Sequence, residues 1–171
     1  MPLLETFGGA PTLLDHLKSG RIRGVVNLVG CNSPKVVYEE SVVRVAEELI
    51  AHDVLALTKG CAAFALLKMG FCLPEGLAGA GARPGPGLNA VLGPLKLPPV
   101  WHMGECLDNA RASAFCRTFS NASGEPLRAL PLAFSRPEWS NEKGVGAALS
   151  FRLLGLNSYH CRRLRSASGW C

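Results

Sequence analysis

Short apolar runs along this chain alternate with stretches in which apolar residues recur every three or four positions. Residues 24–30 (GVVNLVG) and 53–58 (DVLALT) are continuous aliphatic runs, which are typical of strands buried on both faces. Between them, residues 38–52 place apolar side chains on one stripe and glutamates on the others, and this pattern predicts an amphipathic helix. The Ala- and Leu-rich residues 62–70 predict a second helix.

The same alternation continues along the rest of the chain. It predicts a third strand in residues 97–103 and a fourth in residues 128–134. Strands and helices that alternate at this spacing predict an α/β fold, a Rossmann-like doubly wound sheet that is mostly parallel and has right-handed crossovers. Further helices are expected at residues 11–19, 88–92 and 107–119, and from about residue 141.

Three cysteines occupy the same place in this pattern, just after a predicted strand. Cys31, Cys61 and Cys106 follow the first, second and third strands, each beside or near a glycine, and Lys143 follows the fourth strand. Ligands of parallel α/β sheets bind outside the carboxyl ends of the strands, which all lie at one edge. We therefore predict that three thiols and one amine, far apart in sequence, gather at one edge of the sheet.

The spacing of these cysteines indicates what kind of site they form. Intervals of 30 and 45 residues exclude the local CxxC spacing of zinc ribbons and ferredoxins. The site must therefore be assembled by the fold. Thiolates are soft ligands, so an iron–sulfur cluster, zinc, copper(I) or nickel all remain open. Cys72 and Cys116 are expected to be structural.

Two further side chains are candidates for proton transfer at this edge. His102 lies four residues before Cys106 and could act as a ligand, carry protons or simply hydrogen-bond to the backbone. Lys143 stands at a predicted helix start, where a cation is unfavourable, and Trp139 nearby suggests that it is partly buried. A lysine held near a metal could move protons during catalysis.

The net charge of +5 does not indicate a nucleic-acid-binding surface. Residues 1–150 hold fourteen Lys and Arg against thirteen Asp and Glu, which leaves +1. No apolar run reaches the ~18 residues of a membrane span, and the N-terminus lacks the pattern of a signal peptide. We expect a cytoplasmic protein that binds neither nucleic acid nor membrane. The remaining positive charge comes from Arg152, Arg162, Arg163 and Arg165.

Four stretches of this sequence together form a recognisable pattern: GVVNLVGCNSPK, DVLALTKGCAA, LPPVWHMGECLDNAR and PEWSNEKG. They resemble the nickel–iron–sulfur carbon monoxide dehydrogenase family of anaerobic enzymes. They occur in the order and at the spacing of the family and cover roughly residues 20–148. The resemblance implies that Cys31 and Cys61 bind irons of a Ni–Fe–S cluster, the C-cluster, and that Cys106 binds its nickel. It also implies that Lys143 hydrogen-bonds the oxygen of bound CO₂ or hydroxide, while His102 lies beside the cluster.

The resemblance also implies a reaction and partners. The expected reaction is CO + H₂O ⇌ CO₂ with release of two protons and two electrons. The electrons would leave through [4Fe–4S] clusters in another part of the parent enzyme, towards a ferredoxin-like carrier. The parent is expected to be a homodimer, and acetyl-CoA synthase is a further implied partner.

The chain also departs from the family pattern. The family's cluster needs a histidine and two more cysteines from an upstream domain, which these 171 residues lack. We therefore expect an incomplete, inactive C-terminal fragment of a larger subunit. Glu105 stands where a small residue is expected. A reductase of the hybrid cluster protein type and an independent metal or iron–sulfur binding module are the alternatives.

The sequence divides into one long domain and a short tail. Residues 1–160 are expected to form one cluster-binding α/β domain. Residues 161–171 are rich in Arg and Ser, have no hydrophobic period and are expected to be a non-native tail. A DNA sequence that reads without interruption into a family-like ending would overturn this expectation about the tail.

Overall fold

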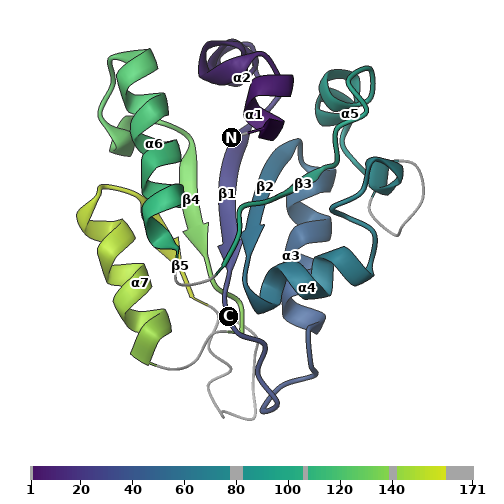
Figure 1. The fold of residues 1–171 in the computed structure, drawn as a ribbon, viewed down its shortest axis with the longest axis vertical. Helices are drawn as coiled ribbons and strands as arrows, with labels where there is room; N and C mark the ends of the chain where they lie inside the picture. Colours follow the sequence, from purple (N-terminus) through teal and green to yellow (C-terminus); the bar gives the residue numbers. More distant parts are fainter. Residues whose placement is uncertain (1, 78–82, 106–107, 139–141, 161–171) are drawn as a thin grey trace.

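The computed structural model describes residues 2–77, 83–105, 108–138 and 142–160. These residues build one five-stranded sheet, in which every neighbouring pair of strands is parallel (Figure 1). The strand order is β3-β2-β1-β4-β5, which is the order of a doubly wound sheet. The strands are β1 (Gly24–Val29), β2 (Val54–Lys59), β3 (Val100–His102), β4 (Leu132–Ser135) and β5 (Asn157–Tyr159).

Helices cover both faces of this sheet, as the predicted fold class requires. In Figure 1, α3 and α4 lie on one side of the strands and α6 and α7 on the other. Right-handed crossovers produce this division because the strand order reverses after β3. The helices are α1 (Pro2–Thr6), α2 (Gly9–Lys18), α3 (Glu40–Ala51), α4 (Cys61–Lys68), α5 (Pro86–Leu92), α6 (Asn109–Ser123) and α7 (Glu142–Leu153), with 3₁₀ turns at Pro74–Leu77 and Leu127–Ala129.

The burial of the first two strands explains why they could be predicted from the sequence. Nearly every residue of β1 and β2 is buried, because helices cover both faces of these central strands. Aromatic rings fill the layers beside the sheet: the Phe134 and Phe151 rings stack at 4.5 Å, and Phe7 meets Trp101 edge-on at 5.6 Å. Trp101 is the largest of the fully buried side chains in the described residues.

The fifth strand was not predicted. Strand β5 has only three residues, Asn157–Tyr159, and pairs with β4 alone at the edge of the sheet. Its side chains are exposed or half-buried, so the sequence carries no apolar run there. The pairing is made by the backbone, and the Arg136 N–H also donates to the Tyr159 carbonyl at 3.1 Å.

The strand arrows in Figure 1 all point to one edge of the sheet, opposite α1, α2 and α5. At this carboxyl edge, β1 lies between β2 and β4, with Val29 beside Lys59 and Leu28 beside Ser135. The point where the strand order reverses is where open α/β sheets hold their ligands. The fold therefore puts the loop after β1 at the centre of the expected site.

Candidate metal centre

The loops that carry Cys31 and Cys61 leave the sheet side by side. Strands β1 and β2 stay in register up to their last residues, so each strand ends in a Gly-Cys pair at the same level. The Ala62 N–H donates to the Gly30 carbonyl at 3.0 Å and joins the two loops directly. Gly60 has a φ of +67°, a region in which a side chain would strain the backbone. The predicted approach of these two cysteines therefore follows from the register of the strands.

The segment that leads to Cys106 runs beside the second cysteine loop. Strand β3 pairs His102 with Thr58, and the Met103 N–H donates to the Thr58 carbonyl at 2.7 Å. The Gly60 N–H then donates to the Gly104 carbonyl at 3.1 Å. Cys106 itself lies outside the described residues. The side chain of His102 is exposed at the end of its strand.

The position of Lys143 differs in part from the prediction. Lys143 is the second residue of α7, just after the helix start, as the sequence indicated. Its side chain is exposed, however, so the partial burial predicted from Trp139 is wrong. The buried residues of α7 are Gly144, Ala147, Ala148 and Phe151, and Lys143 is not among them. Trp139 lies outside the described residues.

A buried carboxylate, Glu138, connects the loop after β4 to the loop of Cys31. Only 4% of Glu138 is exposed. Its Oε2 accepts hydrogen bonds from the backbone N–H groups of Ser33 (3.1 Å) and Glu39 (3.2 Å), and its Oε1 accepts one from Ser41 (3.1 Å). One side chain thus holds both ends of the segment between Cys31 and α3.

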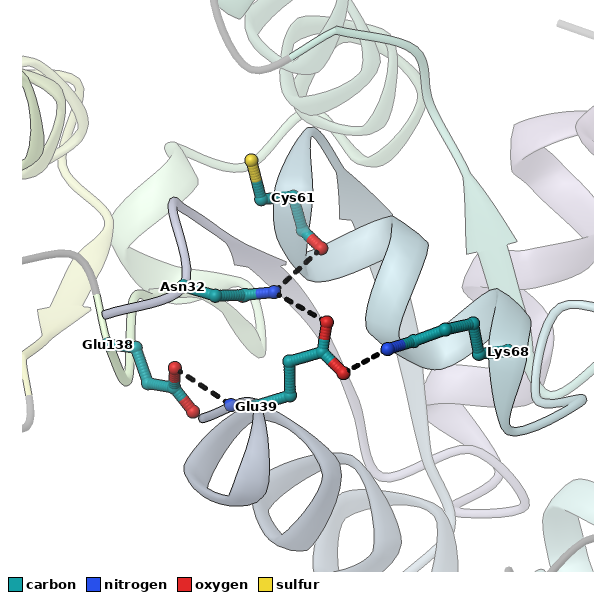
Figure 2. A network of polar contacts seen from close by, with 5 residues as sticks. All are labelled: Asn32, Glu39, Cys61, Lys68 and Glu138. Atoms are coloured by element: carbon teal, nitrogen blue, oxygen red, sulfur yellow. Dashed lines mark hydrogen bonds and ion pairs between the residues drawn. The ribbon is translucent and has the colours of Figure 1, made fainter. Parts of the chain in front are cut away.

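A second set of contacts joins the two cysteine loops (Figure 2). The Asn32 Nδ2 donates to the Cys61 carbonyl at 3.3 Å and to Glu39 Oε1 at 3.1 Å. The other oxygen of Glu39 forms an ion pair with Lys68 in the last turn of α4. We call Asn32, Glu39, Lys68 and Glu138 the loop network. In Figure 2 the Cys61 sulfur points away from the Asn32 amide, while the Cys61 carbonyl points towards it.

Comparison with known proteins places this arrangement in a family. The model of the Prismane/CO dehydrogenase family matches residues 4–168. The chain belongs to this family. Carbon monoxide dehydrogenase 1 of Methanosarcina mazei is 38% identical over 144 residues, which cover 84% of this chain and 22% of that protein. Carbon monoxide dehydrogenase 1 of Carboxydothermus hydrogenoformans is 36% identical over 155 residues, covering 86% and 24%.

Solved structures of carbon monoxide dehydrogenases share the fold. The Ni-free enzyme from Thermococcus sp. AM4 has a TM-score of 0.85 at 36% identity, over 92% of this chain and 24% of that one. Carbon monoxide dehydrogenase IV of Carboxydothermus hydrogenoformans has a TM-score of 0.81 at 35% identity, over 86% and 24%. This member of the Prismane/CO dehydrogenase family therefore spans about a quarter of the length of its relatives.

The donor set fits a cluster of the kind the family binds. Cys31 and Cys61 present thiol sulfurs, the ligands that iron–sulfur clusters and nickel prefer. Cys61 is exposed and Cys31 is half-buried, so a large group can reach both. Within the described residues no three His, Cys, Asp or Glu side chains gather closely enough to hold a single metal ion. The described residues thus offer two accessible thiols, Cys31 and Cys61, at the carboxyl edge of the sheet.

Neither the loop network nor the buried cation Lys59 was predicted from the sequence. Lys59, the last residue of β2, is fully buried, and its Nζ donates to the Asp108 carbonyl at 3.2 Å. A lysine at the end of an otherwise apolar run was the available signal, because lysine is rarely buried without a partner. Glu138 lies within the PEWSNEKG stretch, but nothing in its sequence context indicates that it is buried.

The two remaining described cysteines have a different environment. Cys116 is buried in α6, and Cys72 is half-buried after α4. Burial raises the pKa of each thiol to about 11, because the charged thiolate is poorly solvated there. Both thiols therefore stay protonated at neutral pH, which agrees with a structural role.

Alkylation should separate these two classes of cysteine. We expect iodoacetamide at pH 8 to modify the exposed Cys61 much faster than Cys72 and Cys116, because only the thiolate reacts. The difference should shrink as the pH rises towards 11, where about half of the Cys72 and Cys116 thiols are ionised. Peptide mapping by mass spectrometry measures each site, with a Cys61→Ser chain as the control. Equal rates at pH 8 would contradict the burial of Cys72 and Cys116.

The described helices give no indication of a membrane span, since none of them combines sufficient length with sufficient apolar character.

Proposed function

We propose that this chain is the cluster-binding domain of a carbon monoxide dehydrogenase, which oxidises CO with water to CO₂, two protons and two electrons. The observation that carries the proposal is the placement of Cys31 and Cys61 on adjacent strand ends of a fold shared with these enzymes. The named relatives point the same way, since those at 36–38% identity are carbon monoxide dehydrogenases. They favour this chemistry over a hybrid cluster protein or an independent module.

In this proposal the thiols of Cys31, Cys61 and Cys106 hold a Ni–Fe–S cluster. When bound, the cluster supplies the redox-active metals at which CO is oxidised. The Lys143 ammonium donates a hydrogen bond to an oxygen of the substrate, and its charge stabilises negative charge that develops there. The exposed imidazole of His102 can accept a released proton and pass it to solvent.

The parent enzyme would complete the electron path. We propose [4Fe–4S] clusters outside this chain, a ferredoxin-like acceptor, a homodimer and a cytoplasmic location. One similar structure contains NiZn[Fe4S4] and NiNi[Fe4S4] clusters in alpha subunits of acetyl-CoA synthase/carbon monoxide dehydrogenase. Its TM-score is 0.80 at 29% identity, over 86% of this chain and 23% of that one. We therefore include acetyl-CoA synthase among the proposed partners.

A chimaera tests the proposal. This chain would replace the matching 22% of carbon monoxide dehydrogenase 1 of Methanosarcina mazei. Under anaerobic conditions we expect the chimaera to reduce methyl viologen with CO, and the 171-residue chain alone to show no activity. Nickel and iron analysis should show both metals in the chimaera.

The control is a chimaera with Cys61→Ser, which should lose CO oxidation and most of its nickel. Hydroxylamine reduction, assayed on the same samples, tests the hybrid cluster alternative. A chimaera that binds nickel and iron but oxidises no CO would contradict the proposed function.

A further inference from the structure

We propose that Glu138 is a positioning residue, which, with the rest of the loop network, sets the spacing of the Cys31 and Cys61 thiols before any metal binds. The inference rests on the proposed function in one respect, since it takes these two cysteines as ligands. None of the contacts that hold the two loops involves a cysteine sulfur.

The start of α3 is held by an acceptor from outside the helix. The first N–H groups of a helix have no partner within it, and Glu39, the residue before α3, makes no side-chain cap. Glu138, in the loop after β4, supplies the missing acceptor and binds the N–H groups of Glu39 and Ser41. The positive end of the helix dipole further favours a carboxylate there. The start of α3 therefore holds the Glu138 carboxylate in a fixed position.

The same carboxylate also binds the loop that follows Cys31. The same Oε2 that accepts from Glu39 also accepts from the N–H of Ser33, two residues after Cys31. On its other side, Cys31 follows Gly30, whose carbonyl is bound by Ala62. The Cys31 backbone is thus held on both sides by fixed partners. Glu39 has a φ of +66°, a conformation that a non-glycine residue keeps only where its surroundings impose it.

The Cys31 loop also contacts α4, the helix that begins at Cys61. Cys61 is the first residue of α4 and Lys68 is the last. Asn32 binds the carbonyl of Cys61, and Glu39 binds Lys68, so the Cys31 loop contacts both ends of α4. A rigid helix tied at both ends cannot slide past the loop. The register of β1 and β2 brings the two cysteine backbones together, and the contacts of Asn32 with Cys61 and of Glu39 with Lys68 add to what holds their spacing.

Cadmium binding tests the inference without requiring enzyme activity. The complete 171-residue chain is titrated with Cd²⁺ in a reducing, anaerobic buffer, and the ultraviolet thiolate-to-cadmium band is recorded. We expect Glu138→Gln to weaken Cd²⁺ binding by about 10- to 100-fold, the usual effect of removing a group that orients a metal ligand. The matched control is Glu125→Gln, an exposed carboxylate in the turn after α6, which should bind Cd²⁺ like the unmodified chain.

Two further variants separate this inference from the proposed function. Cys31→Ser and Cys61→Ser should each lose most of the band if these thiols are ligands. If both lose it while Glu138→Gln keeps full affinity, the positioning role is wrong and the ligands stand. If neither loses it, the ligand assignment behind the proposed function is wrong. Should circular dichroism show that Glu138→Gln does not fold, Asn32→Ala provides the same comparison from the loop itself.

Discussion

Replacing Trp101 by alanine is expected to lower the free energy of unfolding by about 4 kcal/mol, the usual cost of removing a large buried aromatic side chain. Trp101 is fully buried in β3, its ring meets Phe7 edge-on, and its Nε1 donates to the Pro98 carbonyl at 3.0 Å. Alanine would leave a cavity and an unpaired carbonyl. Because domains of this size are stable by only about 5–15 kcal/mol, the loss would be a large share of the total.

Urea unfolding followed by circular dichroism measures this loss. Trp101→Phe keeps most of the volume and should be less destabilising than alanine. The control is Leu153→Ala at the end of α7, where 81% of the leucine is already exposed, and its effect should stay within about 0.5 kcal/mol. A Trp101→Ala chain as stable as the control would show that β3 does not pack as described. The result also concerns the site, because β3 leads to His102 and Gly104.

Replacing Glu138 by alanine is expected to cost about 3 kcal/mol of unfolding free energy. The substitution removes the acceptor for three backbone N–H groups, and each buried donor left without a partner costs about 1–3 kcal/mol. Water that enters the space left by the side chain restores part of this loss. Glu138→Gln should lower the free energy of unfolding less than Glu138→Ala, because the amide oxygen of glutamine still accepts a hydrogen bond. Its NH₂ group, however, faces a backbone N–H and cannot accept from it.

Hydrogen exchange locates the effect of Glu138→Ala within the chain. The amides of Ser33, Glu39 and Ser41 should exchange much faster in the variant, while amides in β1 and β2 should change only as far as global stability falls. Glu125→Ala serves as the control and should change neither the urea midpoint nor these amides. Unchanged protection at Ser33 and Glu39 would mean that other groups hold the Cys31 loop.

The central part of the fold was predictable because its sequence signals are local. Strands β1 and β2 are covered on both faces, so their residues are aliphatic in unbroken runs and stand out from the amphipathic α3 between them. The alternation of these elements then predicts a parallel sheet by topology alone. Strand β5 lacked such a signal, since an exposed three-residue edge strand is held by backbone hydrogen bonds that any residue can make.

The same division applies to the site. The sequence by itself determined that Cys31 and Cys61 follow strands of a parallel sheet at its carboxyl edge, because strands that alternate with helices run in one direction. The structure adds that these two strands are neighbours. Only the tertiary structure decided that Glu138 is buried, that Lys143 is exposed and that Asn32 reaches the Cys61 carbonyl. The bonds from Glu138 join residues 97 to 105 positions apart in the chain. The residues around Glu138 in the sequence do not indicate such distant partners. Its burial depends on backbone N–H groups that reach it only when the chain is folded.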